Sequence, residues 1–226
     1  MKRPWVQVLA RSYVRRRLAR AMDGVWVHGL ARARAAVAAG PVLLCATHAA
    51  WWDALVIVAV DEALGGDGYG LMDQDQLRKF PFFASIGAIG LDRTSPAAMR
   101  RGLKTALALL EGPRSVWIFP QGRHRPPHLR PLGLQRGHEL LARGVTVLPV
   151  ALTYAFREAP QPSAILSFEA PNADLEAGLI GGLDRIDQWV DTGDGAFEEL
   201  IPARGSRIDR SPATRLLGVL TGRARG

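Results

Sequence analysis

The chain has 226 residues, of which 48% are hydrophobic and 22% are charged, as is typical of one globular domain with a sizeable core. Its formal net charge of +8 favours nucleic acid, anionic lipid or phosphorylated ligands as partners. The single cysteine, Cys45, excludes an internal disulfide, and no apolar stretch reaches the roughly 18 residues of a membrane-spanning helix. We therefore expect a cytoplasmic protein that does not cross a membrane.

Residues 1–24 are predicted to form a basic amphipathic helix. The first 20 residues contain no acid, and arginines interrupt the apolar residues too often for a signal peptide. Apolar side chains recur at near-helical spacing: Trp5, Leu9, Val14, Leu18 and Met22. Two interpretations stay open. The helix binds the surface of an anionic membrane, or it packs its apolar face on the domain and leaves the arginines in water.

Residues 25–202 are predicted to form the main domain, and 203–226 a basic tail with a short helix near 212–220. Strands alternate with helices over 25–155, which predicts a three-layer α/β/α fold with a mixed, mostly parallel central sheet. The expected strands are 25–29, 42–46, 69–72, 87–93, 115–119, 145–154 and 164–168, and the expected helices are 31–39, 53–64, 95–110 and 132–143. An acidic, helix-leaning stretch begins at Glu169.

His48 and Asp53 stand where the apolar strand 42–46 gives way to a helix. Five residues along a continuous helix turn the side chain by about 140°, so these two side chains meet only if the chain turns between them. In that turn, Asp53 would accept a hydrogen bond from one ring nitrogen of His48 and leave the other nitrogen as a base. The alternative is a turn histidine beside a helix N-cap, because this spacing also occurs by chance.

Cationic side chains follow two of the predicted strands. Arg93 lies between a strand end and a helix N-terminus, where unpaired N–H groups, the helix dipole and the guanidinium favour an anion. The loop 123–131 packs arginines among prolines. Histidines at 124, 128 and 138 raise the question of a metal, but the proline pair prevents a helical His-x3-His face and the loop holds no acid. We expect no metal.

Four separated segments, taken in order, resemble the four blocks of the glycerolipid (lysophosphatidate-type) acyltransferase family: 48–53, 87–93, 119–122 and 147–150. The aromatic stretch 79–83 before the second block is similar too; by itself it predicts either the start of a core-covering helix or an apolar wall for a substrate. The resemblance spans roughly residues 25–155. It implies transfer of an acyl group from acyl-CoA or acyl-carrier protein, as co-substrate, to a lipid alcohol, without another cofactor.

The same resemblance implies roles for individual residues. His48 would be the general base that removes the proton of the acceptor hydroxyl, and Asp53 would orient it. Arg93 would hold a phosphate of the acceptor or donor, with the 119–122 loop opposite. The expected substrate-binding residues are Thr47, Trp51, Arg93, Phe119, Pro120, Gln121, Gly122, Arg123 and Arg125.

Two positions depart from the family pattern. The third block normally reads Phe-Pro-Glu-Gly-Thr-Arg, whereas here Gln121 replaces the glutamate and Arg123-His124 replace Thr-Arg. Gly90 stands in the second block where a bulky apolar residue is usual. Both departures extend the expected acceptors from lysophosphatidate to other lipid alcohols and glycosylated lipids.

The leading hypothesis is an O-acyltransferase bound peripherally to the cytosolic face of an anionic membrane. A thioester or ester hydrolase ranks lower, because the chain lacks a Gly-x-Ser-x-Gly nucleophile elbow. A basic membrane- or nucleic-acid-binding module without catalysis is the third hypothesis. Aromatic residues are not interleaved with the basic ones as base-stacking platforms require, so we expect no nucleic acid.

Overall fold

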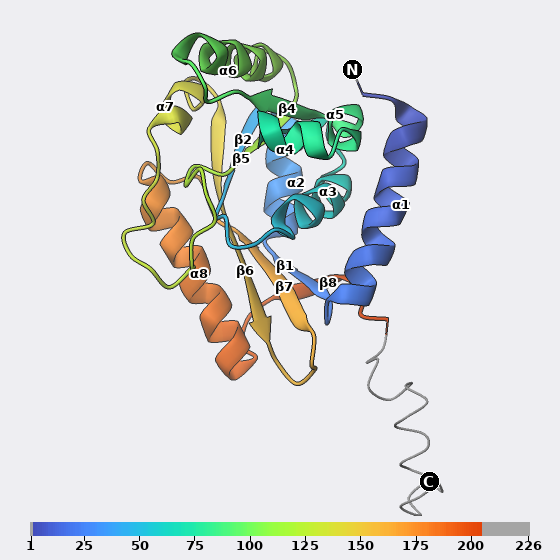
Figure 1. Ribbon diagram of the computed structural model, residues 1–226. Coiled ribbons are helices and arrows are strands. Elements are labelled where there is room, and N and C mark those ends of the chain that lie inside the picture. The colour runs from blue at the N-terminus through green and yellow to red at the C-terminus, as the bar shows by residue number, and fades with distance from the viewer. Residues whose placement is uncertain (1, 205–226) are drawn as a thin grey trace, which may run out of the picture.

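The structure is a computed structural model that describes residues 2–204 (Figure 1). The helix predicted near 212–220 lies outside the described residues. Eight strands form one sheet, and their bounds in spatial order are β4 Ala88–Leu91, β3 Gly68–Asp73, β5 Ser115–Ile118, β2 Val42–Ala46, β6 Thr146–Phe156, β7 Pro162–Phe168, β1 Val25–His28 and β8 Phe197–Ile201. Neighbours from β4 to β6 are parallel, as are β7 and β1, whereas β6–β7 and β1–β8 pair antiparallel. The predicted mixed, mostly parallel sheet is confirmed.

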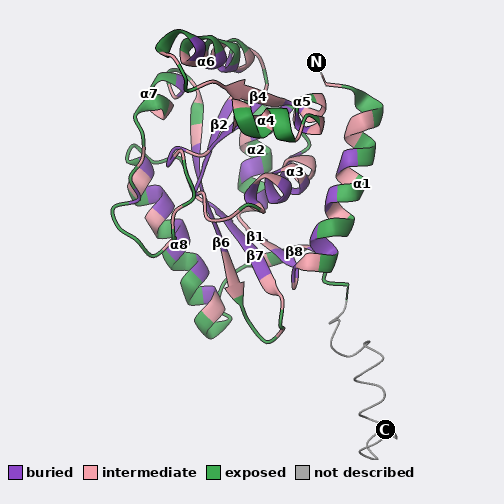
Figure 2. Ribbon diagram, viewed as in Figure 1, coloured by how far each residue is buried: buried purple, intermediate pink, exposed green. Residues whose placement is uncertain are grey.

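Helices cover both faces of the sheet. One face carries α1 Pro4–Ala21, α2 Leu30–Ala39, α3 Asp53–Leu64, α4 Gln74–Lys79 and α5 Phe82–Ile86, and the other carries α6 Pro96–Leu110, α7 Gly137–Leu141 and α8 Leu175–Thr192. The central strand β2 is buried throughout (Figure 2). Its side chains alternate between two cores, Leu44 packing with α1–α3 and Leu43 with α6–α8. The three-layer α/β/α prediction is therefore confirmed.

Local signals set several helix ends. Ser95 caps α6 by accepting a hydrogen bond from Ala98 N at 3.1 Å, and Pro96 occupies the first turn, as predicted. Asp174 caps α8 by accepting from Ala177 N at 3.0 Å. This helix ends at Gly193, whose left-handed φ of 75° suits a residue without a Cβ.

Two predicted elements are wrong in part, whereas the predicted start of a core-covering helix within 79–83 agrees with α5, whose Phe83 is buried. The helix expected at 132–143 is reduced to α7, because Gln135 N donates to Pro120 O at 2.8 Å and holds the preceding segment against the end of β5. The stretch around Phe80 forms two short helices, α4 and α5, which Pro81 separates. The acidic, helix-leaning region also contains β8, which pairs with β1 and packs Phe197 on Trp189 with ring centroids 4.5 Å apart.

Helix α1 divides the predicted apolar stripe between two faces. Val14 and Leu18 are fully buried in the core with α3, whereas Trp5 and Leu9 are 64% and 61% exposed. The step of five residues from Leu9 to Val14 rotates the helix by about 140°, so the two halves of the stripe point in different directions. The packing interpretation is thus confirmed for Val14, Leu18 and Met22 of the predicted stripe, but not for Trp5 and Leu9. Within residues 2–204, no helix is long and apolar enough to cross a membrane.

Candidate active site

The candidate site lies at the carboxyl ends of the parallel strands. His48 follows β2, Phe119 follows β5 and Arg93 follows β4, and all three line one cavity. The carboxyl ends of parallel strands meet at one edge of a sheet, so residues from distant parts of the chain converge there. The fold therefore brings together three of the four segments that carried the resemblance.

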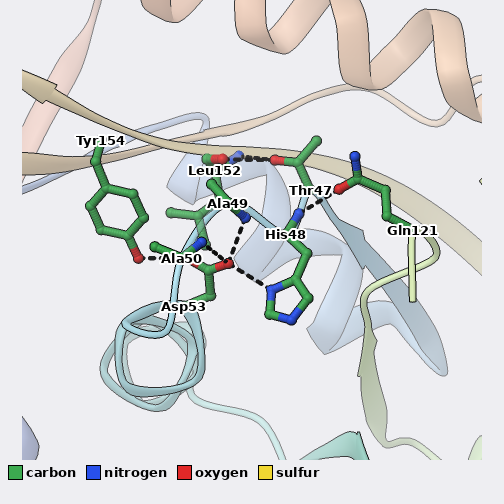
Figure 3. Close-up of polar contacts among 8 residues, drawn as sticks. All are labelled: Thr47, His48, Ala49, Ala50, Asp53, Gln121, Leu152 and Tyr154. Atoms are coloured by element: carbon green, nitrogen blue, oxygen red, sulfur yellow. Dashed lines mark hydrogen bonds and ion pairs between the residues drawn. The ribbon is translucent and has the colours of Figure 1, made fainter. Parts of the chain in front are cut away.

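His48 and Asp53 meet across a turn, as their spacing required. Nδ1 of His48 lies 2.7 Å from Oδ2 of Asp53, and the same oxygen accepts hydrogen bonds from the backbone N–H groups of Ala49 and Ala50 at 2.8 and 3.0 Å (Figure 3). The Asp53 side chain is fully buried at the start of α3, whereas His48 is 21% exposed. Asp53 thus shapes the turn and orients the imidazole at the same time.

Tyr154, which no sequence pattern singled out, completes the surroundings of Asp53. Its hydroxyl, on β6, donates to Oδ1 of Asp53 at 2.6 Å (Figure 3). Burial, together with the negative charge of Asp53, raises the pKa of Tyr154 far above its ordinary value, so this phenol stays a donor. Tyr154 is distant from His48 in sequence, and only the β2–β6 pairing places it at the site.

Two predicted substrate-binding residues face away from the cavity. Thr47 is buried, and its hydroxyl donates to Leu152 O at 2.8 Å and accepts from Leu152 N at 2.7 Å. Gln121 is also buried; its Oε1 accepts from His48 N at 2.6 Å, and its Nε2 donates to Leu132 O at 3.2 Å. These contacts hold the His48 turn and the loop after β5 in place.

The amide of Gln121 has a structural use that a glutamate could not serve. A carboxylate could accept from His48 N, but it has no proton to donate to Leu132 O. The glutamine that replaces the family's glutamate therefore fits a loop that brings the Leu132 carbonyl within reach of the Gln121 amide. The effect of Gln121 on the choice of acceptor stays a prediction.

The cavity has a volume of about 280 Å³ and combines apolar walls with one strong cation. Phe119 stacks on His48 with ring centroids 4.0 Å apart. Trp51, half exposed, lies at the rim and contacts Phe80 edge-on. Arg93 donates to Gly122 O at 3.1 Å, which ties the loop after β4 to the loop after β5. Phe80 and Phe83 line this cavity, and a role of the 79–83 stretch as an apolar wall for a substrate stays a prediction.

The other predicted binding residues belong to the loop behind this rim. Pro120 is buried, and its carbonyl accepts from Gln135 N. Arg123 is exposed, whereas Arg125 is partly buried and donates from its backbone N–H to His48 O at 2.8 Å. Arg123 and Arg125 therefore add positive charge beside the cavity without lining it.

His124 lies against the His48 ring, with centroids 4.1 Å apart. Burial and the neighbouring His48 lower the pKa of His124, so a neutral imidazole is favoured there. Ligand atoms of His48, Asp53 and His124 lie within 4.8 Å of one another, a grouping that the sequence did not reveal. In this structure the Asp53 oxygen beside His48 already accepts three hydrogen bonds. A metal there would compete with the pairing that orients the imidazole.

Comparison with known proteins identifies the family. A family model described as Acyltransferase matches residues 24–153, more than half of the chain. This chain belongs to the acyltransferase family. The matched segment contains the residues of the cavity, so the enzyme is an acyltransferase of the lysophosphatidate type whose family acts on a lipid acceptor and an acyl donor. A search of curated proteins finds no significant match. The family assignment does not favour the hypothesis of a basic module without catalysis.

Proposed function

We propose that this acyltransferase moves a fatty acyl group from acyl-CoA or acyl-carrier protein to the hydroxyl of a lysophospholipid or another lipid alcohol. The His48–Asp53 pair at the cavity carries this proposal. Because Asp53 engages Nδ1 of His48, Nε2 is the nitrogen left to act as a base on a hydroxyl in the cavity that His48 lines.

In the proposed reaction, Nε2 of His48 takes the proton of the acceptor hydroxyl as its oxygen attacks the thioester carbonyl carbon. The tetrahedral intermediate then collapses, the carbon–sulfur bond breaks, and the thiolate recovers the proton from the imidazolium. Asp53 stabilises the imidazolium between these steps. Its own orientation is fixed by Tyr154 and by the Ala49 and Ala50 N–H groups.

Arg93 is the proposed phosphate-binding residue. Its guanidinium lines the cavity, donates to Gly122 O, and lies 4.0 Å from the Asp73 carboxylate. Both anchors hold the guanidinium at the rim, where it can bind a phosphate of the acceptor or donor. Arg123 and Arg125 strengthen the attraction for an anionic substrate.

The first half of α1 is the proposed membrane-binding surface. Trp5, Val8, Leu9 and Tyr13 are all more than half exposed on one face of the helix. Exposed arginines accompany them: Arg3, Arg16, Arg17 and Arg20. An apolar face flanked by cations suits an anionic bilayer, which would supply the lipid acceptor.

The decisive experiment incubates the protein with labelled acyl-CoA and a total lipid extract and identifies the labelled product by mass. A parallel incubation replaces acyl-CoA with acyl-carrier protein. We expect His48→Ala and Asp53→Asn to abolish transfer while the protein stays folded. The control is His128→Ala, at an exposed histidine, which should transfer acyl groups like the unmodified protein. Normal transfer by folded His48→Ala would refute the proposal.

A further inference from the structure

A second cavity, of about 80 Å³, adjoins the active-site cavity between α1, α3, β3 and α5. The two cavities have several lining residues in common: Ala54, Leu71, Met72, Phe83 and Phe119. Phe119 stacks on His48 on one side and faces the second cavity on the other. The residues that line both cavities are apolar, so a chain that passed from one cavity to the other would meet apolar side chains there.

The second cavity is lined mostly by apolar side chains, and its polar lining side chains include Gln7 and Arg11 of α1 and Asp61 of α3. Asp61 is the one acid on α3 that lines this cavity, and Trp117 Nε1 donates to its Oδ1 at 2.9 Å. Within residues 2–204, the bond from Trp117 to Oδ1 is the one side-chain hydrogen bond that Asp61 accepts, and its side chain is only partly buried. A Cβ added to Gly68 would lie 1.8 Å from the Asp61 carboxyl, so β3 needs glycine there to leave room for it.

The environment of Asp61 favours its uncharged form. Burial raises the pKa of Asp61, although the hydrogen bond from Trp117 and the charges of Lys2 and Arg11 act in the opposite direction. A neutral carboxyl both donates and accepts a hydrogen bond, as a hydroxyl does. The group that matches it best in an apolar cavity is therefore an uncharged alcohol.

We propose that the second cavity receives the end of an acyl chain that carries a hydroxyl group, and that Asp61 is its hydrogen-bond partner. This proposal rests on the proposed acyl transfer. The acyl chain fits this path better than the acceptor does, because its apolar carbons begin next to the reacting carbonyl. The acceptor's reacting oxygen is attached to a polar headgroup, which the cations at the rim attract.

Asp61 thus becomes a specificity-determining residue. An unsubstituted chain would cover Oδ2 of Asp61 and offer it no partner, whereas a hydroxyl at that depth restores the hydrogen bond. One net hydrogen bond corresponds to a preference of about tenfold in kcat/KM. The preference should depend on chain length, because only one length places a terminal hydroxyl beside the carboxyl.

The test compares ω-hydroxyacyl-CoAs of stepped length with unsubstituted acyl-CoAs of the same lengths. We expect a preference of about tenfold for the hydroxylated donor at one length, and its loss in Asp61→Leu. Asp191→Leu, at an exposed acid of α8, should keep it. No preference at any length, or an unchanged preference in folded Asp61→Leu, would overturn the proposal.

A second variant covers the case in which Asp61→Leu does not fold. Gly70 lines the second cavity, and a Cβ added there would meet nothing within 4 Å. We expect Gly70→Leu to fill the cavity, removing both the preference for a terminal hydroxyl and the transfer of long chains while short acyl groups still react. An unchanged preference among acyl donors in Gly70→Leu would contradict the proposal, as an unchanged preference in folded Asp61→Leu would.

A binding measurement separates this proposal from the proposed function. The indole N–H of Trp117 reports on Asp61, and its ¹⁵N resonance can be assigned with Trp117→Phe. Across free fatty acids of stepped length, we expect the ω-hydroxy acid of one length to shift this resonance more than the unsubstituted acid of that length does, whether or not the protein transfers acyl groups. Equal shifts would refute recognition of the hydroxyl, while a selective shift without any transfer would refute the proposed function alone.

Discussion

Asp53 accepts hydrogen bonds on both carboxylate oxygens although its side chain is fully buried. Removing a carboxylate from water is costly unless hydrogen bonds replace the lost hydration. Backbone N–H groups and His48 serve Oδ2, and Tyr154 serves Oδ1. At the scale of single residues, the site is therefore a buried anion whose donors also define the turn.

Tyr154→Phe tests this arrangement. Losing the hydroxyl leaves Oδ1 of Asp53 unpaired, so we expect the free energy of unfolding to fall by about 2 kcal/mol. We expect kcat to fall by about tenfold with little change in KM, because the misoriented imidazole lowers the rate and not the affinity. Tyr13→Phe, at a 53% exposed tyrosine, is the matched control. Denaturant unfolding measures the stability of both variants, and acyl-transfer kinetics in detergent measure their kcat and KM. Unchanged kcat and KM in Tyr154→Phe would contradict a role for this residue in the active site.

Gln121→Glu tests whether the amide serves the loop or the substrate. The introduced carboxylate would face Leu132 O without a donor, and we expect a loss of about 2 kcal/mol in the free energy of unfolding. The order in which lipid acceptors are preferred should stay the same, as measured by product analysis with a lipid extract. Gln188→Glu, exposed on α8, should leave stability unchanged. A changed acceptor order with normal stability would assign Gln121 to the substrate instead.

Among the elements, α1 joins two functions in one helix. Its second half packs Val14 and Leu18 into the core, so deleting the helix would expose apolar surface as well as remove the proposed membrane contact. Substitutions on one face at a time separate these effects. The exposed apolar face ends at Tyr13, and the buried face begins at Ala10.

We expect the double variant Trp5→Ser, Leu9→Ser to bind anionic vesicles at least tenfold more weakly with an unchanged melting temperature, because both side chains are exposed. Val14→Ala should behave oppositely, losing about 2 kcal/mol of unfolding free energy and keeping vesicle binding. Co-sedimentation and thermal unfolding measure the two quantities. Equal vesicle binding by the double variant and the unmodified protein would shift the membrane contact to the cationic loop.

At the level of the whole molecule, an ion pair links α8 to the end of β7. Arg185 on α8 donates to the Glu169 carboxylate after β7 at 3.1 and 3.3 Å, and the Ser167 hydroxyl donates to it at 2.6 Å. Burial opposes the charge of Glu169, but these hydrogen bonds outweigh it and hold its pKa below the usual value. We therefore expect the stability that this pair contributes to depend on pH.

Arg185→Met should reveal this dependence. A pKa lowered by folding stabilises the protein above the unfolded value of 4.5, and the stabilisation is lost as the pH falls through the lower folded value. We expect the variant to lose about 1 kcal/mol at neutral pH, since water screens the half-exposed guanidinium, and to match the unmodified protein in strong acid. Urea unfolding across this pH range measures the difference. A constant difference at all pH values would exclude ionisation of Glu169 as the cause.

Much of the fold follows from local patterns in the sequence. The buried strand β2, the Ser95-Pro96 start of α6 and the turn between His48 and Asp53 depend on neighbouring residues, and each was predictable. The short strand β8 was not, because its few residues alternate too briefly and its acidic surroundings favour a helix. Its conformation depends on pairing with β1, which is distant in the chain.

The alternation of strands and helices and the pair His48–Asp53 could be predicted from local patterns, because side-chain periodicity and turn geometry act over a few residues. The residues that surround this pair come from distant segments and were not predictable in the same way. Tyr154 reaches Asp53 through the β2–β6 pairing, and Gln121 turns inward to Leu132. The carboxyl of Asp61 likewise meets the second cavity only because α3 and β5 pack together. Contacts between distant segments follow from the packing of the whole chain, which no local pattern encodes.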